Sequence, residues 1–176
     1  FGIPGSVGGA VYMNAGAYGG EIKDTLTEVE YFDTETETLR RAPAAELALG
    51  YRESIFQHKP YLLLSATFAL HRGDRAEIEE KMASNMAARR DKQPLEYPSA
   101  GSAFRRPVGH FAAKLIDDAG LRGLSCGDAQ VSEKHAGFII NRGSATSGDV
   151  LELCRIIKEE VAGRYGVSLE TEIGRA

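Results

Sequence analysis

The stretch FGIPGSVGGAVYMNAGAYGG, residues 1–20, is the most informative part of this chain, because seven of its residues are glycine. Glycine loses more conformational freedom on folding than any other residue, so a dense cluster indicates that bare backbone is needed. A common need is the close approach of backbone N–H groups to a phosphate or another anionic group. Neither common glycine-rich phosphate motif is present, since no Lys follows the glycines and no G-x-G-x-x-G occurs. From spacing alone, a nucleotide-type cofactor site and a ligand-free glycine-rich turn between strands both stay open.

The bulk composition is that of an ordinary globular protein. The 176 residues are 43% hydrophobic and 26% charged, with a net charge of −4 at pH 7, and suit one large or two small domains. Acidic and basic residues are interspersed, which argues against nucleic acid or an anionic membrane as the main partner. We expect no transmembrane span and no secretory signal. Cys126 and Cys154 lack metal-ligand spacing, so a reduced, cytoplasmic protein without a metal site is expected, with Cys154 in the core.

Hydrophobic periodicity predicts an α+β chain with two lobes. In the first lobe, strands are expected at 27–32, 36–41 and 61–70, and the run Leu62-Leu63-Leu64 predicts that the last is buried on both faces. A helix is expected from a capping box at Asp74 and Glu77 to Pro94, with one apolar face formed by Ile78, Met82 and Met86.

The stretch 93–102 holds two prolines and several small residues, so we expect a linker without regular structure between the lobes. The second lobe is predicted to hold an amphipathic helix around 111–119, stopped by Gly120, and a helix that Asp149 opens and Gly166 stops. Strands are expected at 129–131, 137–140 and 167–173.

Three short segments could carry chemistry, each with a simpler alternative. Arg52 could hold a carboxylate through two parallel hydrogen bonds, or form a surface ion pair. Ser102 could be a positioned proton donor, or a turn or capping serine. Strand alternation puts Glu170 and Glu172 on one face, where one could act as a general acid or both could be solvated. The four histidines show no metal-ligand spacing.

Together these segments resemble the UDP-N-acetylenolpyruvoylglucosamine reductase family of bacterial flavoenzymes, also called UDP-N-acetylmuramate dehydrogenases. The opening resembles the family signature G-I-P-G-x-x-G-G-A-x-x-M-N-x-G-A-Y-G. Further segments look like the family in the family order, over essentially the whole chain: 50–56, 93–106, 130–141 and 169–172. The segment 97–102, followed closely by the helix at Phe111, looks like the compact subtype, which lacks an extra substrate-covering loop.

The resemblance implies the fold and the cofactor. The family has a two-part FAD-binding domain of the PCMH or vanillyl-alcohol-oxidase type, so residues 1–93 are expected to be its C-terminal part and residues 94–176 an α+β substrate-binding domain. Because the family's flavin domain begins further upstream with its own phosphate loop, we expect the C-terminal portion of such an enzyme, with half of the flavin site. The residues expected to bind FAD are Gly2, Ile3, Pro4, Gly5, Ser6, Val7, Gly8, Gly9, Ala10, Asn14, Gly16 and Ala17.

The resemblance also implies a reaction of peptidoglycan precursor synthesis, which serves cell-wall biogenesis, cell shape and cell division. NADPH is the co-substrate, and the flavin passes a hydride to the enolpyruvyl double bond of a nucleotide sugar, UDP-N-acetylglucosamine enolpyruvate, giving UDP-N-acetylmuramate. Ser102 matches the proton donor, and Arg52 and Glu172 match the pair that stabilises the enol form of the substrate carboxylate. A monomer is expected.

Further residues are expected to contact the substrate or its diphosphate, namely Tyr51, Arg106, Arg122 and His135. The chain has Gly174 where the family often has Arg, and Arg175 is expected to compensate in part. Two other hypotheses stay open: another FAD-dependent oxidoreductase of the same fold with a different substrate, and a non-catalytic nucleotide-binding fragment that lacks half of the flavin site.

Overall fold

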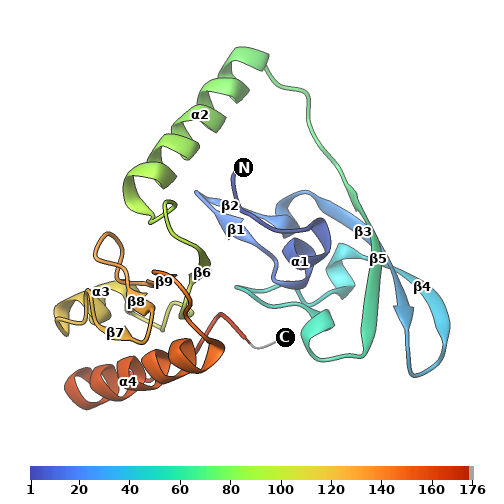
Figure 1. Ribbon diagram of the computed structural model, residues 1–176. Helices are drawn as coiled ribbons and strands as arrows, with labels where there is room; N and C mark the ends of the chain where they lie inside the picture. The colour runs from blue at the N-terminus through green and yellow to red at the C-terminus, as the bar shows by residue number, and fades with distance from the viewer. Residues whose placement is uncertain (175–176) are drawn as a thin grey trace. The chain divides into compact units, whose positions relative to one another are not determined.

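The computed structural model describes residues 1–174, so Arg175 lies outside the described residues. The chain forms two compact units, Phe1–Met86 and Ala87–Ala176, each with its own hydrophobic core (Figure 1). Both units combine helices with antiparallel sheets, which confirms the predicted α+β class. No helix in the described range 1–174 has both the length and the apolar run needed to cross a bilayer.

The first unit begins with a short helix and a small hairpin, and continues with a three-stranded antiparallel sheet. Its helix and hairpin are α1 (Val7–Tyr12), β1 (Gly16–Ala17) and β2 (Gly20–Glu21), and its sheet has the order β4 (Thr38–Pro43), β3 (Leu26–Asp33), β5 (Tyr61–Phe68). Three short 3-10 helices lie between these elements, at Ile22–Asp24, Ala44–Glu46 and Ile55–Gln57. The three predicted strands are thereby confirmed within a few residues.

The central strand β3 places its apolar residues in the core of the first unit. Leu26, Val29 and Tyr31 are buried, while the polar residues between them are exposed or half-buried, as expected for a half-buried strand. The Tyr31 ring packs edge-on against Phe56, with 5.9 Å between the ring centroids. This contact joins the sheet to the 3-10 helix that follows the Arg52 segment.

The prediction that β5 is buried on both faces is wrong. Leu62 and Leu64 are 58% and 52% exposed, and only Leu63 between them packs against the core. Side chains alternate between the two faces of a strand, and Leu62 and Leu64 lie on the face of β5 that is turned away from the core. A short apolar run cannot by itself distinguish a central strand from an edge strand.

Helix α2 (Arg75–Lys92) contains the boundary between the two units and ends before the buried Pro94, as predicted. Asp74 caps it, since its Oδ1 accepts the N–H groups of Ala76 and Glu77 at 2.9 and 3.1 Å. The predicted apolar face is not buried, because Ile78 is 48% exposed and the buried residue of this helix is Arg89.

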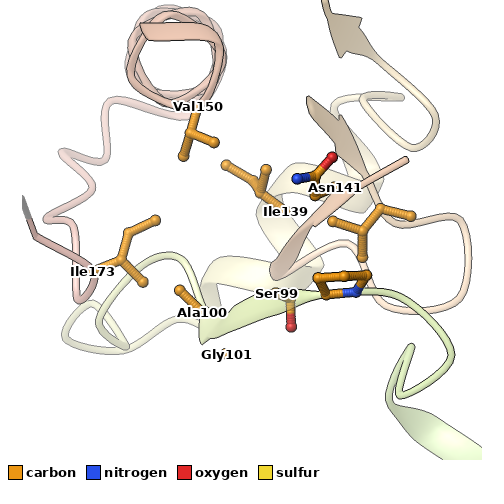
Figure 2. A pocket seen from close by; sticks show the side chains of 9 residues that line it. Ser99, Ala100, Gly101, Ile139, Asn141, Val150 and Ile173 are labelled. Carbon is orange, nitrogen blue, oxygen red and sulfur yellow. The ribbon is translucent and has the colours of Figure 1, made fainter. Parts of the chain in front are cut away.

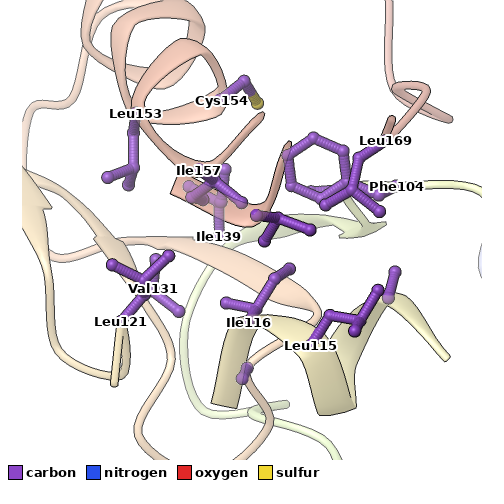
Figure 3. Packing of buried hydrophobic residues seen from close by; sticks show 14 of the residues in the cluster. Phe104, Leu115, Ile116, Leu121, Val131, Ile139, Leu153, Cys154, Ile157 and Leu169 are labelled. Carbon is purple, nitrogen blue, oxygen red and sulfur yellow. The ribbon is translucent and has the colours of Figure 1, made fainter. Parts of the chain in front are cut away.

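The second unit packs two helices against a four-stranded antiparallel sheet. The sheet has the order β6 (Ser99–Ser102), β9 (Phe138–Asn141), β8 (Ala129–Val131), β7 (Ser125–Cys126), and the helices are α3 (Ala112–Asp118) and α4 (Ser147–Tyr165). Side chains from α3, α4 and the sheet meet in one core, which Figure 3 shows around Ile116, Ile157 and Ile139. Cys154 is buried there, as predicted.

The predicted ends of the helices in the second unit are confirmed. Gly120 follows α3, and Gly166 ends α4 with a left-handed φ of 66°. Helix α4 starts slightly before the expected Asp149, because Thr146 is its N-cap and Asp149 completes a capping box with it.

Two sequence predictions for the second unit are wrong. Residues 99–102 of the expected linker form strand β6, which pairs with β9 and includes a register shift. The expected final strand 167–173 is mostly irregular and pairs only at the bridge between Phe104 and Thr171. In both cases the pairing partner lies far away in the sequence, so local composition does not predict it.

Candidate functional site

The glycine-rich segment exposes much of its backbone. After the irregular stretch 1–5, Ser6 caps α1, and its Oγ accepts the N–H of Gly9 at 3.1 Å. The N–H groups of Val7 and Gly8 lie in the first turn, where an α-helix supplies no acceptor of its own. Most residues of the stretch 1–10 are exposed. The segment therefore offers accessible backbone donors, as an anionic ligand requires.

Gly16 has a structural reason to be glycine. A Cβ on this residue would lie 2.7 Å from Cγ of Glu21 and 2.8 Å from the carbonyl oxygen of Gly20. These two residues belong to β2, which pairs with the β1 strand of Gly16. The close approach of the two strands therefore accounts for this glycine, and its contact with a cofactor stays a prediction.

Asn14 is fully buried and its amide is engaged inside the first unit. Its Nδ2 donates to the carbonyl oxygen of Gly50 at 2.7 Å and to the Glu21 carboxylate at 3.1 Å, and its Oδ1 accepts the Lys23 N–H at 2.9 Å. The pKa of the Glu21 carboxyl is lowered by its hydrogen bond with Lys23 and also by the one from Asn14. The side chain of Asn14 thus holds protein segments together, and a cofactor contact through its backbone stays a prediction.

Arg52 lies in a tight turn that the structure brings against the glycine-rich segment. Gly50 and Glu53 exchange backbone hydrogen bonds of 3.1 and 3.3 Å, and Arg52 between them has a left-handed φ of 55°. Its Nη2 donates to the carbonyl oxygen of Gly16 at 2.7 Å, and its guanidinium lies 5.0 Å from the ring centroid of the exposed Tyr51. A left-handed conformation costs a non-glycine residue about 1–2 kcal/mol. Such strain is common at functional sites.

Ser102 and Glu172 lie on adjoining segments of the second unit. Ser102 ends strand β6, and next to it Ala103 accepts the N–H of Glu172 at 2.9 Å. The bridge between Phe104 and Thr171 continues this pairing. Ser102 is exposed, and its hydroxyl makes no hydrogen bond with another residue in the range 1–174. The structure therefore pairs the backbone segments that carry these two residues, and their shared catalytic role stays a prediction.

A pocket of about 300 Å³ lies beside both residues in the second unit. Gly101, which precedes Ser102, and Ile173, which follows Glu172, are part of its wall (Figure 2). Val150 of α4 and Ile139 of β9 line it with apolar surface, and Asn141 adds a polar amide. The pocket could accept a largely apolar group, although its lining includes neither Ser102 nor Glu172.

The predicted diphosphate contacts Arg106 and Arg122 have different surroundings. Arg106 is exposed and stacks over the Phe111 ring, with 4.0 Å from its guanidinium carbon to the ring centroid. Arg122 is engaged inside the unit, since it donates to both carboxylate oxygens of Asp117 and to the carbonyl oxygen of Glu133. Arg106 is thus free to turn toward a ligand, whereas the geometry of Arg122 favours a structural role.

His135 is half-buried and packs edge-on against Phe138, with 5.0 Å between the ring centroids. Its Nδ1 accepts the N–H of Gly137 at 3.1 Å, so the neutral ring carries its proton on Nε2. Burial lowers the pKa of His135 below its ordinary value of 6.5, and the Arg122 cation also lowers it. A substrate contact by this residue would therefore be a hydrogen bond donated by a neutral imidazole.

Sequence reasoning missed Ser54 and Gln57, which fasten the Arg52 turn to the glycine-rich segment. The buried Ser54 hydroxyl donates to the carbonyl oxygen of Tyr12 at 2.6 Å. The Gln57 amide donates to the carbonyl oxygens of Tyr12 and Arg52, both at 3.0 Å. Only their place next to Arg52 in the sequence could have signalled this role. Among residues 1–174, no group of three or more His, Cys, Asp or Glu side chains could hold a metal ion.

Comparison with known proteins gives one consistent result. Residues 93–176 match the family described as "UDP-N-acetylenolpyruvoylglucosamine reductase, C-terminal domain". The chain is 56% identical to the reductase of that name from Agathobacter rectalis and 53% identical to that from Enterococcus faecalis, each over 172 residues. These matches cover 98% of this chain but only 54% and 57% of the two relatives. The crystal structure of a UDP-N-acetylenolpyruvylglucosamine reductase from Thermus caldophilus matches with a TM-score of 0.85 and 40% identity, covering 98% of this chain and 61% of that one.

Proposed function

Because the chain belongs to the UDP-N-acetylenolpyruvoylglucosamine reductase family, whose C-terminal domain it carries at 93–176, we propose that it contributes the substrate-reducing residues of such an enzyme. The chain spans little more than half the length of the relatives that it matches, so the activity of the whole enzyme is part of this proposal. The proposed reaction is the reduction of UDP-N-acetylglucosamine enolpyruvate to UDP-N-acetylmuramate, with NADPH as the reductant, in the cytoplasm.

FAD is the proposed cofactor, and the glycine-rich segment fits part of such a group. Its diphosphate needs accessible N–H donors, which Val7 and Gly8 offer at the start of α1. Gly5, whose φ of 145° suits glycine alone, has no atom within 4 Å of an added Cβ, so the backbone there is open to a ligand. When bound, FAD supplies the hydride chemistry.

Ser102 is the proposed proton donor. Adding a hydride to the enolpyruvyl double bond leaves negative charge on the carbon next to the substrate carboxylate, and that carbon must then take a proton. The exposed Ser102 hydroxyl, with no hydrogen bond to another residue within 1–174, has a proton to give. The observation that carries this proposal is the hydrogen bond from Glu172 N–H to the carbonyl oxygen of Ala103, which holds the backbone of Glu172 against the segment that carries Ser102.

Arg52 and Glu172 are the proposed partners of the substrate carboxylate. The charge that builds on its oxygens during the reaction can be stabilised by the Arg52 guanidinium and by a hydrogen bond donated by the Glu172 carboxyl group. The strained turn and the bond to Gly16 hold the Arg52 guanidinium in one place before substrate arrives. Such preorganisation is a main source of catalytic stabilisation.

The test is Ser102→Ala in the complete enzyme, with the two half-reactions measured separately by flavin absorbance. We expect reduction by NADPH to keep its rate, and reoxidation by UDP-N-acetylglucosamine enolpyruvate to slow by about 10²–10⁴-fold, the usual contribution of a positioned proton donor. Equal loss of both half-reactions would contradict the proton-donor role. A preparation that binds no flavin would instead favour the non-catalytic alternative.

A further inference from the structure

We propose that Asn14 is a positioning residue for Arg52, coupling the glycine-rich segment to the turn that carries this guanidinium. The inference rests on the proposed function of Arg52. It assigns to Asn14 a role other than cofactor contact, and it predicts that the effect of Asn14 on the reaction passes through the turn at 50–53.

The first support is the complete use of the Asn14 amide. Its two hydrogen bonds from Nδ2 reach Gly50 and Glu21, and the one to Oδ1 comes from Lys23, so the amide joins the segment 21–23 to the distant Gly50. Asp offers no N–H donor and would place a second carboxylate against Glu21. The φ of Asn14 is 40°, a left-handed value that Asn tolerates better than most residues. The hydrogen bonds of the side chain and the left-handed backbone both favour Asn at this position.

The second support is the acceptor of the shortest of these hydrogen bonds, the carbonyl oxygen of Gly50. The Gly50 carbonyl oxygen that Asn14 holds at 2.7 Å also accepts the N–H of Glu53, which closes the turn around Arg52. Gly50 is itself tightly placed, because an added Cβ would lie 3.2 Å from Cβ of Glu53. Asn14 thus fixes the start of a turn whose second central residue is the strained Arg52.

The third support is that further hydrogen bonds join the segment 12–16 to the segment 50–57 on either side of Asn14. Arg52 Nη2 returns to Gly16, two residues after Asn14, while Ser54 and Gln57 bind the carbonyl oxygen of Tyr12, two residues before it. Asn14 lies between these two points of attachment in the sequence, and it is fully buried. Its loss would free the turn between its two outer anchors.

The experiment uses the complete enzyme with bound FAD and compares Asn14→Asp, Arg52→Lys and the double variant. Asn85→Asp is the matched control. It makes the same change of amide to carboxylate, but on α2, away from the glycine-rich segment and the Arg52 turn in the sequence. Two quantities are measured: hydrogen exchange of the peptide that covers 50–57, and the rate of flavin reoxidation by saturating UDP-N-acetylglucosamine enolpyruvate in a single turnover.

We expect Asn14→Asp to speed exchange in 50–57 and to slow reoxidation by about tenfold or more, the effect of losing the buried hydrogen bond to Gly50. In the Arg52→Lys background, Asn14→Asp should slow reoxidation by less than about a further twofold. Its effect acts through the position of the Arg52 guanidinium, which this variant already lacks. Asn85→Asp should change neither quantity. If Asn14→Asp does not fold, Asn14→Gly, which suits the left-handed φ and removes all three hydrogen bonds, gives the same comparison.

A merely structural role predicts a different pattern. It would lower the melting temperature and slow both half-reactions, with effects that add to those of Arg52→Lys. That additivity, or unchanged exchange in 50–57, would overturn the inference while leaving the proposed function intact. If Arg52→Lys alone leaves reoxidation unchanged, the proposed role of Arg52 fails, and the inference fails with it.

Discussion

Replacement of Gly127 by Ala tests how the second unit joins its sheet to its longest helix. Gly127 occupies the two-residue turn between β7 and β8 and has a left-handed φ of 52°. A Cβ there would lie 2.8 Å from both Cγ and Oδ1 of Asp149, closer than real contacts allow. The Asp149 carboxylate cannot simply move away, because it accepts the Thr146 N–H at 2.8 Å in the capping box of α4.

Two costs combine in this substitution. A left-handed Ala costs about 1 kcal/mol relative to glycine. Displacing Asp149 from the capping box costs about 1 kcal/mol more, the typical value of a helix cap. We therefore expect Gly127→Ala to lower the free energy of unfolding by about 2 kcal/mol, which for a chain of this size lowers the melting temperature by about 4–8 °C.

The matched control is Gly163→Ala in the interior of the same helix. Gly163 is exposed, and an added Cβ would meet no atom within 4 Å. This change should raise the free energy of unfolding by about 0.5–1 kcal/mol, because Ala loses less backbone entropy than Gly in a helix. Urea unfolding followed by circular dichroism measures both variants.

The two substitutions are chemically identical, so their opposite signs isolate the local geometry. An unchanged urea midpoint for Gly127→Ala would refute the argument that Asp149 is held against the turn. The double variant with Asp149→Ala separates the two costs. In that background Gly127→Ala should cost only the backbone strain, about 1 kcal/mol. A cost of the full size there would show that the contact with Asp149 contributes nothing.

The remaining predictions concern pH. The pKa of His135 is lowered in the folded state, mainly by burial, so the unfolded state binds more protons and stability falls as pH drops below 6.5. His135→Gln should remove that part of the pH dependence between pH 7 and 5 in urea unfolding, and an unchanged profile would contradict the assignment. The Thr146 backbone hydrogen bond lowers the pKa of Asp149 below its ordinary value of 3.8. The ionised carboxylate therefore stabilises the fold above pH 3.8, and this stabilisation is lost as the pH falls through the lowered pKa. Asp149→Asn keeps an acceptor but cannot titrate, so its difference in unfolding free energy from the parent should shrink between pH 5 and 2, and a constant difference would refute this.

The sequence predicts elements that are determined by local chemistry. The helix from 147 to 165 has its apolar residues at helical spacing, a cap before it and Gly166 after it, so its existence and its end both follow from neighbouring residues. The same is true of the helix that stops before Pro94. The two strands at 26–33 and 38–43 likewise follow from alternation and a polar turn.

Most elements that the sequence did not predict depend on distant partners, whereas α1 begins at a local cap. Glycine disfavours helix, yet residues 7–12 form α1, where Ser6 supplies the cap. Ser99–Ser102 looks like a linker because its residues are small, and it becomes a strand only because β9 lies beside it. Leu62 and Leu64 look buried, and they are exposed because the core covers only the opposite face of β5, where Leu63 lies.

The candidate site likewise has features that the sequence predicts and features that depend on distant residues. The family signature predicts which residues matter, and the structure adds how Arg52 and Ser102 are held. The role of Asn14 could not be predicted, since its hydrogen-bond partner Gly50 lies 36 residues away in the sequence. A buried, fully bonded amide can be recognised only once the fold brings its acceptors together.

The most direct test of the account is a crystal structure of the complete enzyme with FAD and UDP-N-acetylglucosamine enolpyruvate, using Ser102→Ala to prevent turnover. We predict that Cβ of residue 102 faces the enolpyruvyl carbon that takes the proton, while the Arg52 guanidinium and the Glu172 carboxyl contact the substrate carboxylate. A complex in which any of these three positions lies away from the enolpyruvyl group would contradict the proposed chemistry.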